Sequence, residues 1–400
     1  MKLIVILLMI LYLYSLSYGV FMTELFRIPA PMVFCFPLIF LFKEKIRSIP
    51  YHKEIWAILA AIFFYYIIGL SDVRSFLANS ISVGICILYF YYFISSNTKR
   101  YNYSIIIFYS LLTFSAIVMV FNNYFPAVNS LREFIMGEPV LQSPSGIAIS
   151  QFTFGYQLAA LAPFLLIYTF LFHKPLLVKV LVFLTCLGFI YLGMQRSVLV
   201  TFVISVTLFL MYFYRFKAVL VITTAIFAGV VFFNFVLEEN TSSSDNILAK
   251  NINNDASHNR TLLTAENLNI YADYPLGLVF YGKTWGDAIY RSQVFSSGFT
   301  SHNAYLMFIT YLGPFLGLGL LVFIYSKVVR IGFNALKEIR FRQNKLLLCL
   351  CFSFLAISIN ALSHNAWLIS ADGPTLFLYF SILHLNKLQT EEILIQDLAE

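Results

Sequence analysis

Charged residues are scarce in this chain of 400 residues, since Asp, Glu, Lys and Arg together make up only 11% of it. A soluble domain carries roughly 25%, so the composition excludes a soluble globular enzyme. Hydrophobic residues account for 60% of the chain, and the mean hydropathy over its whole length is +0.82. Such values are expected where most of the chain contacts lipid or other apolar helices. We therefore predict an all-α, polytopic membrane protein.

Cysteine is also scarce, and the common signatures of soluble enzymes are missing. The chain has five cysteines, all of them within apolar runs: Cys35, Cys86, Cys186, Cys349 and Cys351. This placement supports neither a disulfide framework nor a thiolate metal site. The sequence contains no P-loop, GxSxG or HExxH motif. We expect no metal site and no cofactor.

Apolar runs long enough to cross about 30 Å of hydrocarbon recur along the whole chain. The first run could also be a signal peptide, but an uncleaved helix is favoured because many further spans follow. The second run carries Pro29, Pro31 and Pro37 and is expected to be kinked or broken. We predict twelve spans, near 3–20, 28–42, 55–70, 75–95, 103–121, 148–172, 176–194, 197–214, 218–236, 304–326, 346–362 and 366–385.

The distribution of positive charge predicts the orientation of these spans. With the amino terminus in the cytoplasm, 18 of the 26 Lys and Arg residues fall on the cytoplasmic side and eight fall outside. Basic residues prefer cytoplasmic loops, so we expect both termini inside. In a membrane protein a net positive charge, here +7, reflects orientation in the bilayer and not nucleic-acid binding. We therefore expect no nucleic-acid partner.

Three regions follow from this topology. Residues 1–236 hold spans one to nine. They include an outside loop near 122–147, which contains several prolines and is expected to form an irregular cap over the helical bundle. Residues 237–303 form one large outside loop, and residues 304–400 hold the last three spans and a short cytoplasmic tail. Within the large loop, helical spacing predicts an amphipathic helix over 260–274 on the membrane surface or on the bundle. Its apolar positions are Leu262, Ala265, Leu268 and Ala272.

Histidine is the first candidate for chemistry on the outside. The chain has six histidines, and the topology places three of them outside, at positions 258, 302 and 364. His302 lies with Asn303 where the large loop re-enters the membrane, and an imidazole partly screened from water is suited to take a proton from a hydroxyl. An interfacial helix cap is the alternative. The tetrapeptide Ser-His-Asn-Ala at 301–304 recurs at 363–366, which we interpret as chance.

Arginine is the second candidate. Arg196 follows Gln195 in a very short turn between two spans, where a guanidinium costs free energy unless an anion meets it. It either reaches lipid headgroups or clamps a phosphate or diphosphate, and Arg260 and Arg291 could join it or be surface charges. Asp372, an acid inside the predicted last span, is functional or pairs with a neighbouring helix.

Several of these residues fall in a pattern of motifs over about 190–320. The motifs are Gln195-Arg196-Ser197, Asn259-Arg260 followed by Tyr274-Pro275-Leu276-Gly277, and Ser301-His302-Asn303-Ala304-Tyr305-Leu306 with Gly313 and Gly317. With this pattern the chain resembles the O-antigen ligase and O-antigen polymerase superfamily of bacterial inner-membrane glycosyltransferases, which have GT-C-like helical folds. Two departures concern the loop geometry, namely Asn259 where Gly is common and the segment that follows Gly277.

The resemblance implies a mechanism and a location. Arg196 and Arg260 would hold the undecaprenyl diphosphate of the donor, and we predict Arg196 to be a catalytic residue. Beside what the resemblance implies, we predict Arg291, Asn303 and Gln195 to be substrate-binding residues. His302 would be the general base on the acceptor hydroxyl, with inversion at the anomeric carbon and no metal. The active site would face the periplasm from the inner membrane. Cations at the diphosphate would also stabilise the leaving group.

Three functions remain open at this stage. The first is a polymerase that transfers a growing lipid-linked glycan onto a lipid-linked repeat unit. The second is a ligase that moves the glycan to lipid A-core, and the third is a lipid-oligosaccharide flippase or transporter, which would need ionisable residues near the midplane. Expected partners are the undecaprenyl-diphosphate-linked oligosaccharide and membrane lipids, with a chain-length regulator protein as a further candidate.

Overall fold

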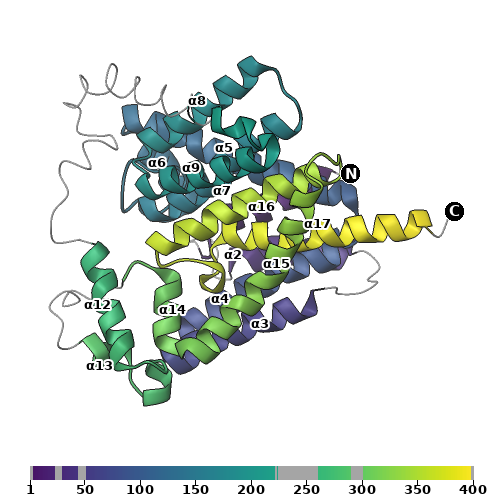
Figure 1. Ribbon diagram of the computed structural model, residues 1–400. Helices are drawn as coiled ribbons and strands as arrows, with labels where there is room; N and C mark the ends of the chain where they lie inside the picture. Colours follow the sequence, from purple (N-terminus) through teal and green to yellow (C-terminus); the bar gives the residue numbers. More distant parts are fainter. Residues whose placement is uncertain are drawn as a thin grey trace.

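A computed structural model of the protein describes residues 3–22, 29–43, 51–220, 223, 260–289 and 301–397. All regular secondary structure within these ranges is helical (Figure 1). Seven helical segments there are long and apolar enough to cross a membrane: His52–Gly69, Val73–Ile94, Thr98–Tyr124, Gln151–Leu171, Arg196–Tyr214, Ala304–Lys337 and Asn344–Ser363. The prediction of an all-helical chain with several candidate membrane spans is therefore confirmed for the part of the chain described.

The segments divide into α-helices and short π- or 3₁₀-helices. The α-helices are α1 (Leu3–Ser17), α2 (Ala30–Phe42), α3 (His52–Ile62), α4 (Val73–Leu88), α5 (Thr98–Tyr124), α6 (Val128–Met136), α7 (Gln151–Leu171), α8 (Leu176–Leu192), α9 (Arg196–Tyr214), α12 (Arg260–Asp273), α13 (Trp285–Ile289), α14 (Ala304–Leu312), α15 (Gly319–Lys337), α16 (Asn344–Asn360) and α17 (Gly373–Asp397). The π-helices are η1 (Phe63–Gly69), η2 (Tyr89–Ile94) and η8 (Gly313–Leu318), and the 3₁₀-helices are η6 (Leu278–Tyr281), η9 (Ala361–Ser363) and η10 (Leu368–Ser370).

Helices occupy eleven of the twelve predicted spans, and the ninth, 218–236, lies almost wholly outside the described residues. The number of membrane crossings remains a prediction. Of the kink or break expected in the second span, the break is absent, because α2 continues as one helix through Pro37, with Pro29 as its N-cap residue and Pro31 in its first turn, and the kink stays a prediction. Proline is tolerated in the first turn of a helix, where the backbone N–H groups lack intrahelical partners.

Successive long helices run back and forth, so that their connections collect at two ends of the bundle. At one end, which we call the histidine end, the backbone nitrogen of Ala304 donates to the carbonyl oxygen of His364 at 2.8 Å. At the other end, which we call the basic end because the turn between α15 and α16 there carries Arg340 and Arg342, Gln389 Nε2 donates to the carbonyl oxygen of Gln343 at 2.8 Å. Figure 1 shows that α1 begins and α17 ends at the same side. This arrangement is the one expected if both termini share a membrane face.

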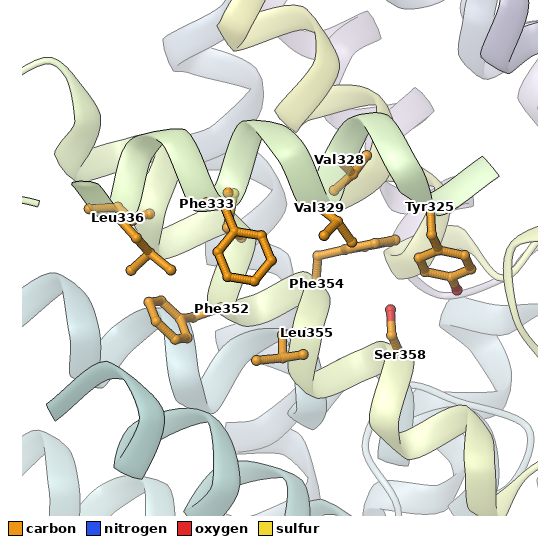
Figure 2. A pocket seen from close by; sticks show the side chains of 12 residues that line it. Tyr325, Val328, Val329, Phe333, Leu336, Phe352, Phe354, Leu355 and Ser358 are labelled. Carbon is orange, nitrogen blue, oxygen red and sulfur yellow. The ribbon is translucent and has the colours of Figure 1, made fainter. Parts of the chain in front are cut away.

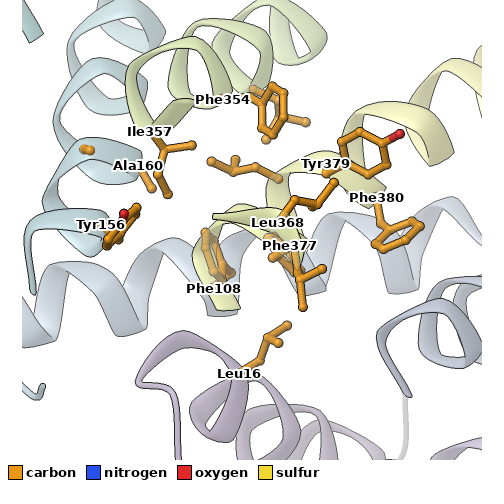
Figure 3. Close-up of a cluster of buried hydrophobic side chains, with 14 of the residues drawn as sticks. Leu16, Phe108, Tyr156, Ala160, Phe354, Ile357, Leu368, Phe377, Tyr379 and Phe380 are labelled. Carbon is orange, nitrogen blue, oxygen red and sulfur yellow. The ribbon is translucent and has the colours of Figure 1, made fainter. Parts of the chain in front are cut away.

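The core lies where α5, α7, α16 and α17 meet (Figure 3). Phe108 of α5 stacks on Phe377 of α17 with ring centroids 4.0 Å apart, and Ser353 of α16 donates to the carbonyl oxygen of Ala160 in α7 at 2.7 Å. Small residues such as Ala160 let helix backbones approach closely in membranes. This packing fixes the starts of α7 and α17 and the end of α16, which all lie at the histidine end.

The predicted cap near 122–147 is built around one buried arginine. Arg132 of α6 is 0% exposed, and its guanidinium donates to six neutral oxygens: Gly146 O, Asn122 Oδ1, Asn129 Oδ1, Ser143 Oγ, Ser145 Oγ and Ala148 O. Burial lowers its pKa to about 10, so the group stays charged at neutral pH. The cap is therefore an ordered structure closed over a cation.

The segment after this arginine enters the bundle. Residues 144–148 are buried although they are not helical. The backbone nitrogen of Ile147 donates to Ser115 Oγ at 2.8 Å, and its carbonyl oxygen accepts from Gln157 Nε2 at 2.8 Å. Buried irregular backbone requires such internal partners, because its polar groups are removed from water.

The predicted helix over 260–274 corresponds to α12, but its predicted apolar face does not pack on the bundle. Leu262 and Leu268 are exposed, whereas Leu263, Asn267 and Ile270 are buried. Asn267 accepts a hydrogen bond from Thr310 of α14. A polar residue thus occupies the centre of the contact face, because the neighbouring helix supplies its partner.

Candidate functional site

Two histidines contact one phenylalanine at the histidine end. The ring of Phe152, in the first turn of α7, lies 6.2 Å from the ring of His302 and 5.3 Å from the ring of His364, measured between centroids. His302 is half-buried and has a φ of +50°, and His364 is 4% exposed. The predicted catalytic histidine therefore lies beside a second histidine to which the sequence alone gave no role.

The backbone joins the two Ser-His-Asn-Ala segments. The hydrogen bond from Ala304 to His364 holds the start of α14 against the segment that follows α16. Asn303 is the N-cap residue of α14, and its Oδ1 accepts from the backbone nitrogen of Leu306 at 3.0 Å. In this structure Asn303 fixes where α14 begins, and through it the position of His302.

Arg196 starts α9 at the same end of the bundle. Its neighbour Gln195 is 5% exposed and donates from Nε2 to the carbonyl oxygen of Gln151 at 2.7 Å, which ties the start of α9 to the start of α7. The next residue, Ser197, lies with its Oγ 3.0 Å from His364 Nε2. The turn that carries Arg196 is thus connected to the histidine pair through Ser197.

Tyr156 of α7 also contacts His364. The ring of Tyr156 lies 5.8 Å from the His364 ring, and the Tyr156 hydroxyl donates to the carbonyl oxygen of Ala366.

Asp372 comes just before α17, where its Oδ2 accepts from the backbone nitrogen of Thr375 at 3.0 Å. Asp372 therefore caps the start of α17, where the helix dipole favours a negative charge, and its depth in a membrane stays a prediction.

An apolar groove of about 200 Å³ runs between α15 and α16 (Figure 2). Leucine, valine and phenylalanine side chains form most of its walls, and Tyr325 and Ser358 lie together at one end of the labelled row. The Tyr325 hydroxyl is 2.7 Å from that of Tyr305, which follows Asn303 by two residues. This end of the groove therefore approaches the start of α14, where His302 lies.

The side chains of the two remaining predicted arginines lie outside the described part of the structure. α12 begins at Arg260, whose side chain lies outside the described part, and Arg291 falls in 290–300, also outside the described residues. Within the described ranges, His, Cys, Asp and Glu form no group of three that could hold a metal ion.

The residue that sequence reasoning missed is His364. Its signal was the repeated Ser-His-Asn-Ala, since both copies lie beside helix ends at the histidine end and are hydrogen-bonded to each other.

No protein-family model matches the chain, and no curated protein sequence is significantly similar to it.

Proposed function

We propose that the protein is a surface-polysaccharide polymerase of a bacterial inner membrane, with twelve spans, a GT-C-like fold and both termini in the cytoplasm. It would be a metal-independent, inverting glycosyltransferase that transfers a growing undecaprenyl-diphosphate-linked glycan onto a lipid-linked repeat unit. The observation that carries the proposal is the convergence of His302, His364 and the Arg196 turn at one end of an apolar helical bundle.

In the proposed reaction His302 takes the proton of the acceptor sugar hydroxyl. The hydroxyl oxygen forms a bond to the anomeric carbon of the donor, and the bond from that carbon to the diphosphate oxygen breaks. The undecaprenyl diphosphate leaves with the electron pair, and the arginines stabilise its charge. We assign this task to Arg196, whose side chain lies in the described part of the structure, with Arg260 and Arg291 as the proposed further contacts.

Two structural features support a lipid-linked donor. The groove between α15 and α16 offers apolar surface to an isoprenoid tail (Figure 2), and its Tyr325 end approaches the histidine site through Tyr305. The contact between Ser197 and His364 would keep the diphosphate-binding arginine in a fixed position relative to the base.

A flippase is the less favoured alternative. It would need ionisable groups near the bilayer midplane, whereas Arg196, His302 and Asp372 all lie at the histidine end of the bundle. A ligase would use the same donor and the same residues.

One assay tests the proposal and separates the two enzymes. Purified protein is incubated with a lipid-diphosphate-linked repeat unit alone, and product length is measured. A ladder of glycan sizes without lipid A-core identifies a polymerase. Product that appears only when lipid A-core is added identifies a ligase, and no glycan transfer with either acceptor would contradict the proposed chemistry.

A further inference from the structure

A polar cavity of about 520 Å³ lies at the basic end of the bundle, between α3 and α15. Its charged lining residues are Lys53 and Glu54 from α3, and Lys327 and Arg330 from α15. The candidate active site is at the other end of the same long segment, Ala304–Lys337, which begins at the histidine end. The cavity therefore belongs to a separate part of the molecule.

The charge of this cavity is positive. Three basic side chains face one carboxylate, which gives a formal balance of 3 − 1 = +2. Glu54 is buried and forms an ion pair with Lys327 at 3.4 Å. Lys53 and Arg330, both exposed, contribute one cation from each wall. Glu54 thus fixes Lys327 in place without neutralising the cavity.

Neutral hydrogen-bonding groups extend the same site. Asn334 of α15 and Asn386 of α17 line this cavity and also an adjoining one of about 330 Å³. α3 begins at His52, so its positive helix end lies beside Lys53. Ammonium, guanidinium and amide groups converging on one hollow are the groups that bind phosphate oxygens.

We propose that this cavity binds a phosphate-bearing anion, with Lys53 and Arg330 as the principal contacts and the side-chain amides of Asn334 and Asn386 as further donors. The anion is either the headgroup of an anionic phospholipid from the adjacent leaflet or free phosphate. Basic pockets between membrane helices bind such headgroups. The site does not depend on the glycosyltransferase function, because none of its residues belongs to the histidine site.

The experiment uses full-length protein in detergent and measures thermal stabilisation and native mass spectra. The probes are phosphatidylglycerol, phosphatidylcholine and inorganic phosphate. The test variant is Lys53→Gln/Arg330→Gln, and the matched control is Arg340→Gln/Arg342→Gln, which removes two charges from the exposed turn at the same end without touching the cavity. We expect the test variant to bind the anionic probe about tenfold more weakly and the control to bind like wild type.

The arms distinguish the two sources. Stabilisation by phosphatidylglycerol but not by inorganic phosphate, lost in the test variant, identifies a lipid headgroup, whereas stabilisation by inorganic phosphate, lost in the same variant, identifies the free anion. Equal binding of phosphatidylcholine, or unchanged anion binding by the test variant, would overturn the proposal. Should the test variant fail to fold, Glu54→Gln provides the second test, because removal of the carboxylate should tighten anion binding, and unaltered or weaker binding contradicts the site.

Discussion

The backbones of Gly277 and Gly313 pack directly against each other, at the crossing point where the chain leaving α12 passes the end of α14. A Cβ added to Gly277 would overlap the backbone nitrogen of Gly313, and one added to Gly313 would overlap the carbonyl oxygen of Leu276. Both residues also have positive φ, +96° and +76°. The crossing joins the described part of the large loop to the helix that begins beside His302.

We therefore expect Gly277→Ala and Gly313→Ala each to lower the free energy of unfolding by about 2–4 kcal/mol. Thermal unfolding of the purified protein measures the loss. Gly282→Ala is the matched control, since Gly282 has a φ of +60° and no atom lies within 4 Å of an added Cβ, so that only backbone strain of about 1 kcal/mol applies. Equal losses for all three variants would show that the close crossing is unimportant.

His302→Ala should lower turnover about 10²–10⁴-fold and leave donor binding intact, because general-base catalysis contributes about that much. The ladder assay and a separate donor-binding measurement test the two effects. His173→Ala is the control, since His173 also has a φ of +50° but is exposed at the basic end. An undiminished ladder from His302→Ala would remove His302 from the chemistry.

Arg196→Lys should lose most activity at normal protein levels, because a point ammonium cannot form the two parallel hydrogen bonds of a guanidinium to diphosphate oxygens. The same assay, with the amount of membrane-inserted protein measured alongside, tests it. Arg74→Lys changes an exposed arginine at the histidine end and should retain activity. Near-normal product from Arg196→Lys would instead assign that residue to lipid headgroups.

Ser197→Ala and His364→Gln should affect the same step, because the serine hydroxyl and the imidazole are 3.0 Å apart. We expect the double variant to be little worse than either single variant, with a coupling of about 0.5–3 kcal/mol. Rates and donor affinities of the four proteins measure this coupling. Strictly additive losses would show that the Ser197–His364 contact does not position the arginine turn.

The orientation can be tested with single cysteines at two exposed phenylalanines. Phe134 on α6 at the histidine end is 85% exposed, and Phe216 at the basic end is 96% exposed. In a background without native cysteines, a membrane-impermeant thiol reagent applied to cells with a permeabilised outer membrane should label Phe134→Cys but not Phe216→Cys. Labelling of position 216 alone would reverse the proposed topology.

The sequence predicted the helices well, because long apolar runs and helical periodicity are local signals. It could not predict which face of a helix packs on the bundle where a distant partner decides the outcome. The apolar pattern of 260–274 pointed to Leu262 and Leu268, but α12 turns Asn267 inward because Thr310 is there to bond it.

The candidate site was predicted in part for the same reason. Motifs indicated the Arg196 turn and His302, which the structure places at one end of the bundle. The contact between Ser197 and His364 joins residues 167 positions apart, and no local pattern specifies such a pairing. The cap that Asp372 forms was not predicted either, because an acid within an apolar run does not reveal that a helix starts just after it.

The cation at the centre of the cap has a consequence for the order of assembly. Every oxygen that Arg132 contacts belongs to a residue within 16 positions of it along the chain, and contacts of low sequence separation form early. The histidine pair instead joins the start of α14 to the segment after α16, which is synthesised near the end. The cap can therefore close on a nascent chain long before the candidate active site exists, and incomplete chains are expected to insert without any capacity for chemistry.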